Sequence, residues 1–140
     1  MSTQTEQDNY AGMTAEQKVK ALVLMRWRAW GYDVPALTKD TINGIWEEIR
    51  KADELRDARN EVRCSGINTG LPCRDVSRNY ESEEVAAQMP DESWVGWTYW
   101  HGGGKHGEPD AIHWIPFAYD LTCTEEQKTV TVRTFAKVGA

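Results

Sequence analysis

This chain of 140 residues has the length of one domain, and its hydrophobic and charged fractions, 40% and 27%, are those of a folded protein rather than a disordered one. Its formal net charge of −6 argues against general binding to nucleic acid or to an anionic membrane, because both attract basic proteins. The chain has no signal-peptide pattern and no apolar run close to the roughly 20 residues that span a bilayer, which predicts a cytoplasmic protein without membrane contact. Its three cysteines, an odd number, indicate free thiols.

The chain begins with a polar stretch and then a helix. Residues 1–13 are mostly polar without periodicity, so we expect them to form a flexible tail. Thr14 and Gln17 match the capping box that begins a helix. Apolar residues at helical spacing continue this helix to about Trp30, and Gly31 is a natural residue to end it.

A second helical pattern follows the first. Its apolar residues recur at three- and four-residue steps after Thr38 or Asp40, either of which can cap the helix. The pattern predicts one helix to about Arg63, or two helices with a break near Asp53. The segment 14–63 is therefore expected to form a helical hairpin whose apolar faces cover each other.

The period changes in the second half of the chain. Residues 64–72 contain glycine and proline and predict a loop. Residues 80–89 fit a strand, although a helix starting at residue 83 fits as well. Residues 90–93 have the composition of a tight turn, and the aromatic residues of 94–100 predict a strand.

The last part of the chain predicts a loop, a short helix and two strands. The glycine-rich loop covers residues 102–107, and Pro109 is placed to begin a short helix that Pro116 ends. The segments 117–124 and 129–137 are expected to be strands, because Thr, Val and Phe alternate in the second of them.

These elements predict a single α+β domain over residues 14–140. We expect the helical hairpin to pack on a small antiparallel sheet of three or four strands, built from residues 78–138. The acidic excess lies in this sheet half, since eleven acidic residues face six basic ones after residue 70. That charge is compatible with a basic partner.

The predicted strand around residue 97 is aromatic on both faces. Val95, Trp97, Tyr99 and His101 share one face, and Trp94, Gly96, Thr98 and Trp100 share the other. One face can pack on the helices. The other is either covered by the short helix through Trp114 or is exposed for binding, because exposed aromatic side chains anchor interfaces. The residues that we expect to bind a ligand or partner are Trp97, Tyr99, Trp100, His101, Gly103, Lys105 and His106.

The glycine-rich loop at 102–107 offers an alternative function. Glycine backbone N–H groups can approach an anion, and Lys105 adds positive charge, so the loop fits a bound phosphate or nucleotide. However, the phosphate-binding P-loop motif requires Ser or Thr after the lysine, and here His106 follows. A tight chain reversal explains the same glycines.

No catalytic or metal-binding motif stands out. His101, His106 and His113 lie close in sequence but match no zinc spacing, and Cys64 and Cys73 do not form a C-x-x-C pair. A nucleophile with an adjacent base is not recognisable either. We therefore expect a non-catalytic protein without a cofactor.

From residue 78 onward the chain resembles a group of uncharacterised small proteins of tailed bacteriophages and prophages. The resemblance rests on Tyr-Glu-Ser at 80–82, the aromatic strand with its Gly-Gly-Gly-Lys-His-Gly-Glu-Pro continuation at 94–109, Ala-Tyr-Asp at 118–120, and the segment 129–135. It covers under half of the chain and carries no known site residues. It implies an accessory protein that binds and inhibits a host protein, such as a defence component, in the host cytoplasm. A nucleotide or anion binder and a structural virion component are the alternatives.

Overall fold

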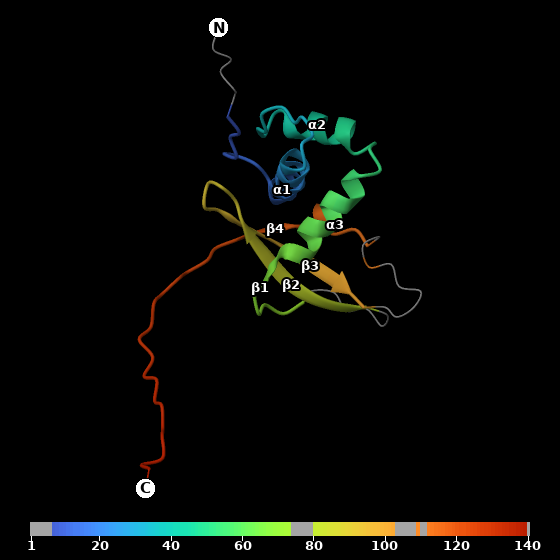
Figure 1. Cartoon of the computed structure of the whole chain (residues 1–140). Helices are drawn as coiled ribbons and strands as arrows, with labels where there is room; N and C mark the ends of the chain where they lie inside the picture. The colour runs from blue at the N-terminus through green and yellow to red at the C-terminus, as the bar shows by residue number, and fades with distance from the viewer. Residues whose placement is uncertain (1–6, 74–79, 103–108, 110–111, 140) are drawn as a thin grey trace.

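The computed structural model describes residues 7–73, 80–102, 109 and 112–139. Within them, three helices lie over one four-stranded antiparallel sheet in the order β1-β2-β3-β4, which confirms the α+β class (Figure 1). The elements are α1 (Ala15–Ala29), α2 (Ile42–Ile49), α3 (Leu55–Ser65), β1 (Ile67–Asn68), β2 (Glu81–Gln88), β3 (Trp94–His101), the 3-10 turn η3 (Ile115–Phe117) and β4 (Tyr119–Leu121).

Helix α1 begins as its sequence predicts. The Thr14 hydroxyl accepts from the Gln17 amide at 3.2 Å, and the Gln17 side chain accepts from the Thr14 amide at 3.0 Å, so the capping box is confirmed. The helix ends one residue before Trp30, and Gly31 follows with φ at 101°. Trp30 does not join the core but is 42% exposed. The buried residues are Ala15, Val19, Ala21, Val23, Leu24 and Trp27.

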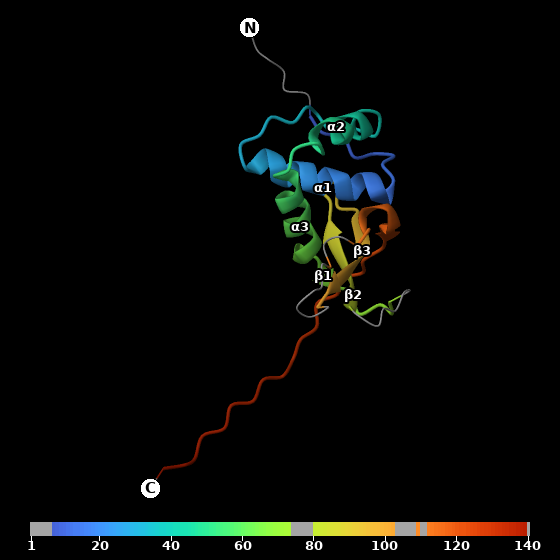
Figure 2. The same ribbon diagram turned by 90° about the vertical axis from the view of Figure 1, so that its right-hand side faces the viewer.

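The second helical pattern forms two helices, so the single long helix is wrong and the break near Asp53 is confirmed. The chain turns between α2 and α3 through three-residue hydrogen bonds, from the Ala52 amide to Ile49 and from the Leu55 amide to Ala52. This turn lets both helices pack against α1 (Figure 2). The expected hairpin is therefore a three-helix layer in which α1 is central.

Strands β2 and β3 form the centre of the sheet. They pair from Glu81↔His101 to Gln88↔Trp94, so the strand interpretation of residues 80–89 is confirmed and the helical one is wrong. The turn at 90–93 is also confirmed, because the Met89 amide donates to the Ser93 carbonyl at 2.7 Å. The predicted loop at 64–72 was wrong in part, since α3 extends to Ser65 and β1 pairs with β2.

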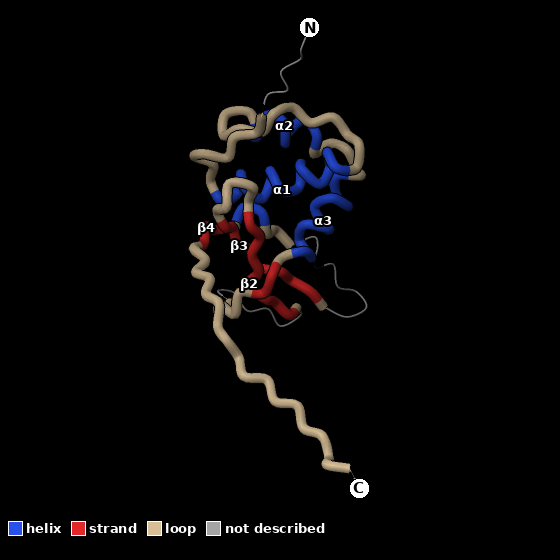
Figure 3. Tube along the Cα trace, turned by 60° about the vertical axis from the view of Figure 1, so that its left-hand side comes forward, coloured by secondary structure: helices blue, strands red, loops and turns tan. Residues whose placement is uncertain are grey.

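The end of the chain departs most from the prediction. The expected strand 117–124 shortens to β4, and Pro116 lies inside η3 rather than ending the short helix expected from Pro109. Residues 110–111 of that expected helix lie outside the described residues. The expected strand 129–137 is wrong, because residues 122–139 belong to no strand and run away from the sheet (Figure 3). Thr129–Phe135 alternates, but the described part of the chain offers it no neighbouring strand.

Residues 7–13 belong to the folded body, contrary to the expectation of a flexible tail before Thr14. The Asn9 amide donates to the Leu37 carbonyl at 2.8 Å, and Tyr10 and Met13 lie in the core at 9% and 6% exposure. The folded domain thus begins earlier than expected.

Candidate functional site

Two of the residues expected to bind a partner are core residues. Trp97 is 0% exposed and Trp100 is 8% exposed. The Trp97 indole donates to the Arg63 carbonyl at 3.2 Å, and its ring centroid lies 5.5 Å from that of Trp114. Trp114 therefore packs on the same face as Trp97, beneath the helices, and does not cover the opposite face as expected. These rings stabilise the body and offer little surface to a partner.

Tyr99 and His101 lie half-buried at the end of β3. Their rings stack at 5.0 Å, and the imidazole lies between two carboxylates, with Nδ1 3.5 Å from Glu81 and Nε2 3.4 Å from Glu83. Burial and a hydrogen bond with the Cys64 thiol raise the pKa of the Tyr99 hydroxyl. The two carboxylates and the Tyr99 ring therefore hold the imidazole at the end of β3.

The other predicted site residues are Gly103, Lys105 and His106, and they lie outside the described residues. The phosphate-binding interpretation of the loop 102–107 therefore stays a prediction. Of its boundary residues the structure describes Gly102, which is exposed and has φ at 78°.

Two buried charged residues escaped the sequence analysis. Arg63, 6% exposed, donates to the Trp100 carbonyl and to the Asn60 side chain and so joins the end of α3 to β3. On the opposite face of the sheet, the Glu84 carboxylate is 3% exposed. It accepts from the Thr98 hydroxyl at 2.8 Å and from the Tyr119 hydroxyl at 2.6 Å. Arg63 therefore holds α3 on the sheet, and Glu84 holds β2, β3 and β4 together.

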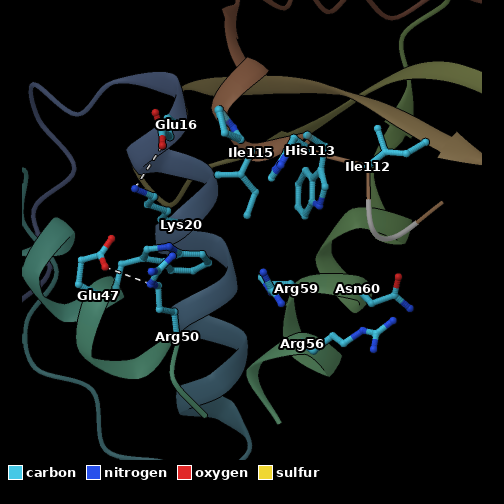
Figure 4. Close-up of a pocket in the computed structure, with 13 residues that line it drawn as sticks. Glu16, Lys20, Glu47, Arg50, Arg56, Arg59, Asn60, Ile112, His113 and Ile115 are labelled. Atoms are coloured by element: carbon cyan, nitrogen blue, oxygen red, sulfur yellow. Dashed lines mark ion pairs between the residues drawn. The ribbon is translucent and has the colours of Figure 1, made fainter. Parts of the chain in front are cut away.

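A cavity of about 660 Å³ lies between the three helices and residues 112–116. Figure 4 shows Lys20, Glu47 and Arg50 along one side, with Arg59 on the opposite side and His113 on a third. The lining residues are Glu16, Lys20, Trp46, Glu47, Arg50, Arg56, Arg59, Asn60 and the segment 112–116. Sequence analysis missed this site, because its walls come from four separate segments.

The C-terminal segment 122–139 is exposed along its whole described length. Val130, Val132 and Val138 are 74%, 83% and 95% exposed. In an extended chain these three valines share one side with Thr134 and Ala136, and the opposite side carries Thr129, Thr131, Arg133, Phe135 and Lys137. The segment therefore has one largely apolar side that nothing described in the chain covers.

No family model, curated protein or solved structure matches this chain. In the part of the chain that the structure describes, no three His, Cys, Asp or Glu side chains come together as a metal site. No helix there is long and apolar enough to cross a membrane. Cys64, Cys73 and Cys123 are free thiols.

Proposed function

We propose that this chain is a non-catalytic accessory protein of the phage type, which binds a host protein in the bacterial cytoplasm and inhibits it. The binding element is the segment Thr129–Val138, which adds as a strand to an unpaired sheet edge of the host protein. The observation that supports the proposal is the exposed, alternating apolar side of this segment. The aromatic strand β3, the site that the sequence favoured, contributes the rigid body instead.

Strand addition fits the chemistry of this segment. An extended peptide that joins a sheet edge gains backbone hydrogen bonds, and alternate side chains give specificity. Val130, Val132 and Val138 would be buried on one side of the enlarged sheet, and each valine contributes about 1.5 kcal/mol when fully buried. The segment 122–139 has no proline, so each of its residues carries a backbone N–H, and alternate ones can pair with a neighbouring strand.

The partner is proposed to be a different protein rather than nucleic acid. The net charge of −6 disfavours a phosphate backbone as partner. The tail itself is nearly balanced, with Glu125 and Glu126 against Lys128, Arg133 and Lys137. Association through this segment thus depends on apolar burial and backbone pairing more than on charge.

Affinity capture from bacterial lysate with the full-length protein tests the proposal. Val132→Lys places a charge on the apolar side, and Val132→Pro removes a backbone donor, so each should weaken capture of the partner by about tenfold or more. Thr131→Lys is the matched control, because it adds the same charge one residue away on the polar side. All three variants should keep the wild-type melting temperature, since Val132 is 83% exposed.

Hydrogen exchange in the captured complex must also show that the backbone amides of the segment Thr129–Val138 are protected. Amides of residues 129–135 should exchange freely in the isolated protein and slowly in the complex. Equal capture by all variants, or unprotected tail amides in the complex, would contradict the proposal. Light scattering of the isolated protein tests whether the segment binds a second copy of the chain instead, as in a virion assembly. An oligomer that grows with protein concentration and that Val132→Lys dissociates would show such self-association and would overturn host binding.

A further inference from the structure

The side of the segment Thr129–Val138 that lies opposite its valines carries both charges of the segment. We propose that this side selects the host protein, whose receiving edge strand carries an acidic residue, an apolar residue and a second acidic residue at alternate positions. This inference rests on the proposed strand addition and names the chemistry of its partner. Its basis is the spacing and exposure of three side chains and the distribution of charge along the chain.

Three side chains alternate along this side of the segment, Arg133, Phe135 and Lys137. In an extended strand, side chains two residues apart point to the same side, so the two charged residues lie about 13 Å apart with the phenylalanine midway. Phe135 is 86% exposed, and both charged residues are exposed as well. The segment therefore presents a cation, an aromatic ring and a second cation in one row.

Neither cation of this row is neutralised within the part of the chain that the structure describes. The Lys128 ammonium, just before the segment, lies 3.0 Å from the Glu126 carboxylate. Arg133 and Lys137, in contrast, form no ion pair with any described residue. Both charges are thus available to a partner that lies along the segment.

The rest of the chain has the opposite charge. Residues 127–140 contain three basic residues and no acidic one, whereas the first 126 residues contain thirteen basic and twenty-two acidic residues. The segment also runs away from the folded body (Figure 3). An acidic strand edge is therefore attracted to the segment and repelled by the body, whereas a basic edge meets like charges on the segment. The valines contribute most of the affinity, and the charges restrict which edge is bound.

The row of side chains also predicts a pattern on the host strand. Residues that lie opposite each other on one face of a sheet are in contact, and pairs of opposite charge or of apolar side chains stabilise the pairing of the strands. Arg133 and Lys137 lie at equal distances from Phe135, so the same acidic, apolar and acidic order results for either direction of the host strand. The valine side faces the host core, so this pattern lies on the solvated face of the host sheet.

Capture of the host protein from bacterial lysate by charge-reversed variants of the full-length protein tests this pattern. The double variant Arg133→Glu with Lys137→Glu should weaken capture by about tenfold or more, because two attractive pairs become two repulsive ones. The matched control is Lys51→Glu with Lys128→Glu, which has the same net charge but leaves the segment unchanged. Both control residues form exposed ion pairs of their own, so the control should stay within about twofold of the wild type.

Hydrogen exchange of the wild-type complex identifies the host strand that becomes protected together with residues 129–135. That strand must carry two acidic residues with the spacing of Arg133 and Lys137, and an apolar residue midway. A protected strand without them, or equal capture by the charge-reversed variant and its control, would overturn this inference. If Val132→Lys still weakens capture in that case, strand addition stands and only the host pattern is wrong. If Val132→Lys also leaves capture unchanged, the proposed function itself fails.

Discussion

Gly66 is a position where a single added methyl group should disrupt the packing of the fold. It follows α3 directly and faces β2 and β3. A Cβ atom built there would lie 2.6 Å from Val85 Cγ2, 2.7 Å from Val85 Cβ and 3.0 Å from Trp97 Cζ2. Carbon atoms in ordinary contact are about 3.5–4.0 Å apart. Gly66→Ala therefore requires the end of α3 and the sheet to separate.

The expected loss of stability depends on how far the side chains next to Gly66 can move. Val85 is 2% exposed and Trp97 is 0% exposed, so neither side chain can move into solvent. Overpacking of this kind costs about 1–3 kcal/mol. The backbone of Gly66, at φ −67° and ψ 151°, suits alanine, which regains about 0.4–1 kcal/mol by restricting the unfolded chain. We expect a net loss of about 1–2 kcal/mol in the free energy of unfolding.

Urea unfolding of matched variants measures this loss. Gly44→Ala is the control, because Gly44 lies in α2, is exposed and has nothing within 4 Å of an added Cβ. That variant should gain about 0.5–1 kcal/mol from helix propensity. The two substitutions are chemically identical and should shift the urea midpoint in opposite directions. A Gly66→Ala midpoint equal to or above the wild type would refute the packing argument.

Three further outcomes are expected of the same body. Asp8→Ala should lower the free energy of unfolding by about 2 kcal/mol, because it removes the carboxylate that pairs with Arg28 at 2.7 Å and accepts from the Leu37 amide at 2.8 Å. Burial opposes ionisation of Asp8, but these hydrogen bonds outweigh it and lower the pKa of its carboxyl. The contribution of Asp8 to the free energy of unfolding is therefore complete above about pH 4 and is lost as the pH falls below that value. Below about pH 4 the wild type should lose more stability than Asp8→Ala does. Tyr119→Phe should cost about 1–2 kcal/mol in urea unfolding, because it removes the 2.6 Å hydrogen bond to buried Glu84.

The elements that local chemistry determines were predictable from the sequence. The capping box of Thr14 and Gln17 marked the start of α1, and the turn residues 90–93 marked the hairpin of β2 and β3. The turn and the pairing across it also explain why residues 80–89 form a strand despite helical alternatives. Each of these features depends on neighbours within a few residues, which a sequence displays directly.

Features that depend on distant segments were not predictable. Alternation in 129–137 correctly identifies the apolar side of an extended chain, but it cannot show whether a neighbouring strand exists in the same molecule. A tryptophan in a strand can be either an interface residue or a core residue, and the sequence around Trp97 does not distinguish the two. Its contacts with the Arg63 carbonyl and with the Trp114 ring show that it belongs to the core. Glu84 likewise directly follows the more exposed Glu83, and the sequence gives no sign that Glu84 is buried.

The cavity and the C-terminal segment lie on one continuous stretch of chain, yet the fold separates them. Trp114 and Ile115 line the cavity and are fixed in the core at 6% and 8% exposure. Between them and the tail, β4 pairs with β3, and the Lys18 ammonium contacts Asp120 at 2.8 Å. The wall of the cavity is therefore anchored to α1 and to the sheet before the exposed segment begins at Thr122. A partner bound to the tail therefore acts beyond this anchor and requires no change in the wall of the cavity.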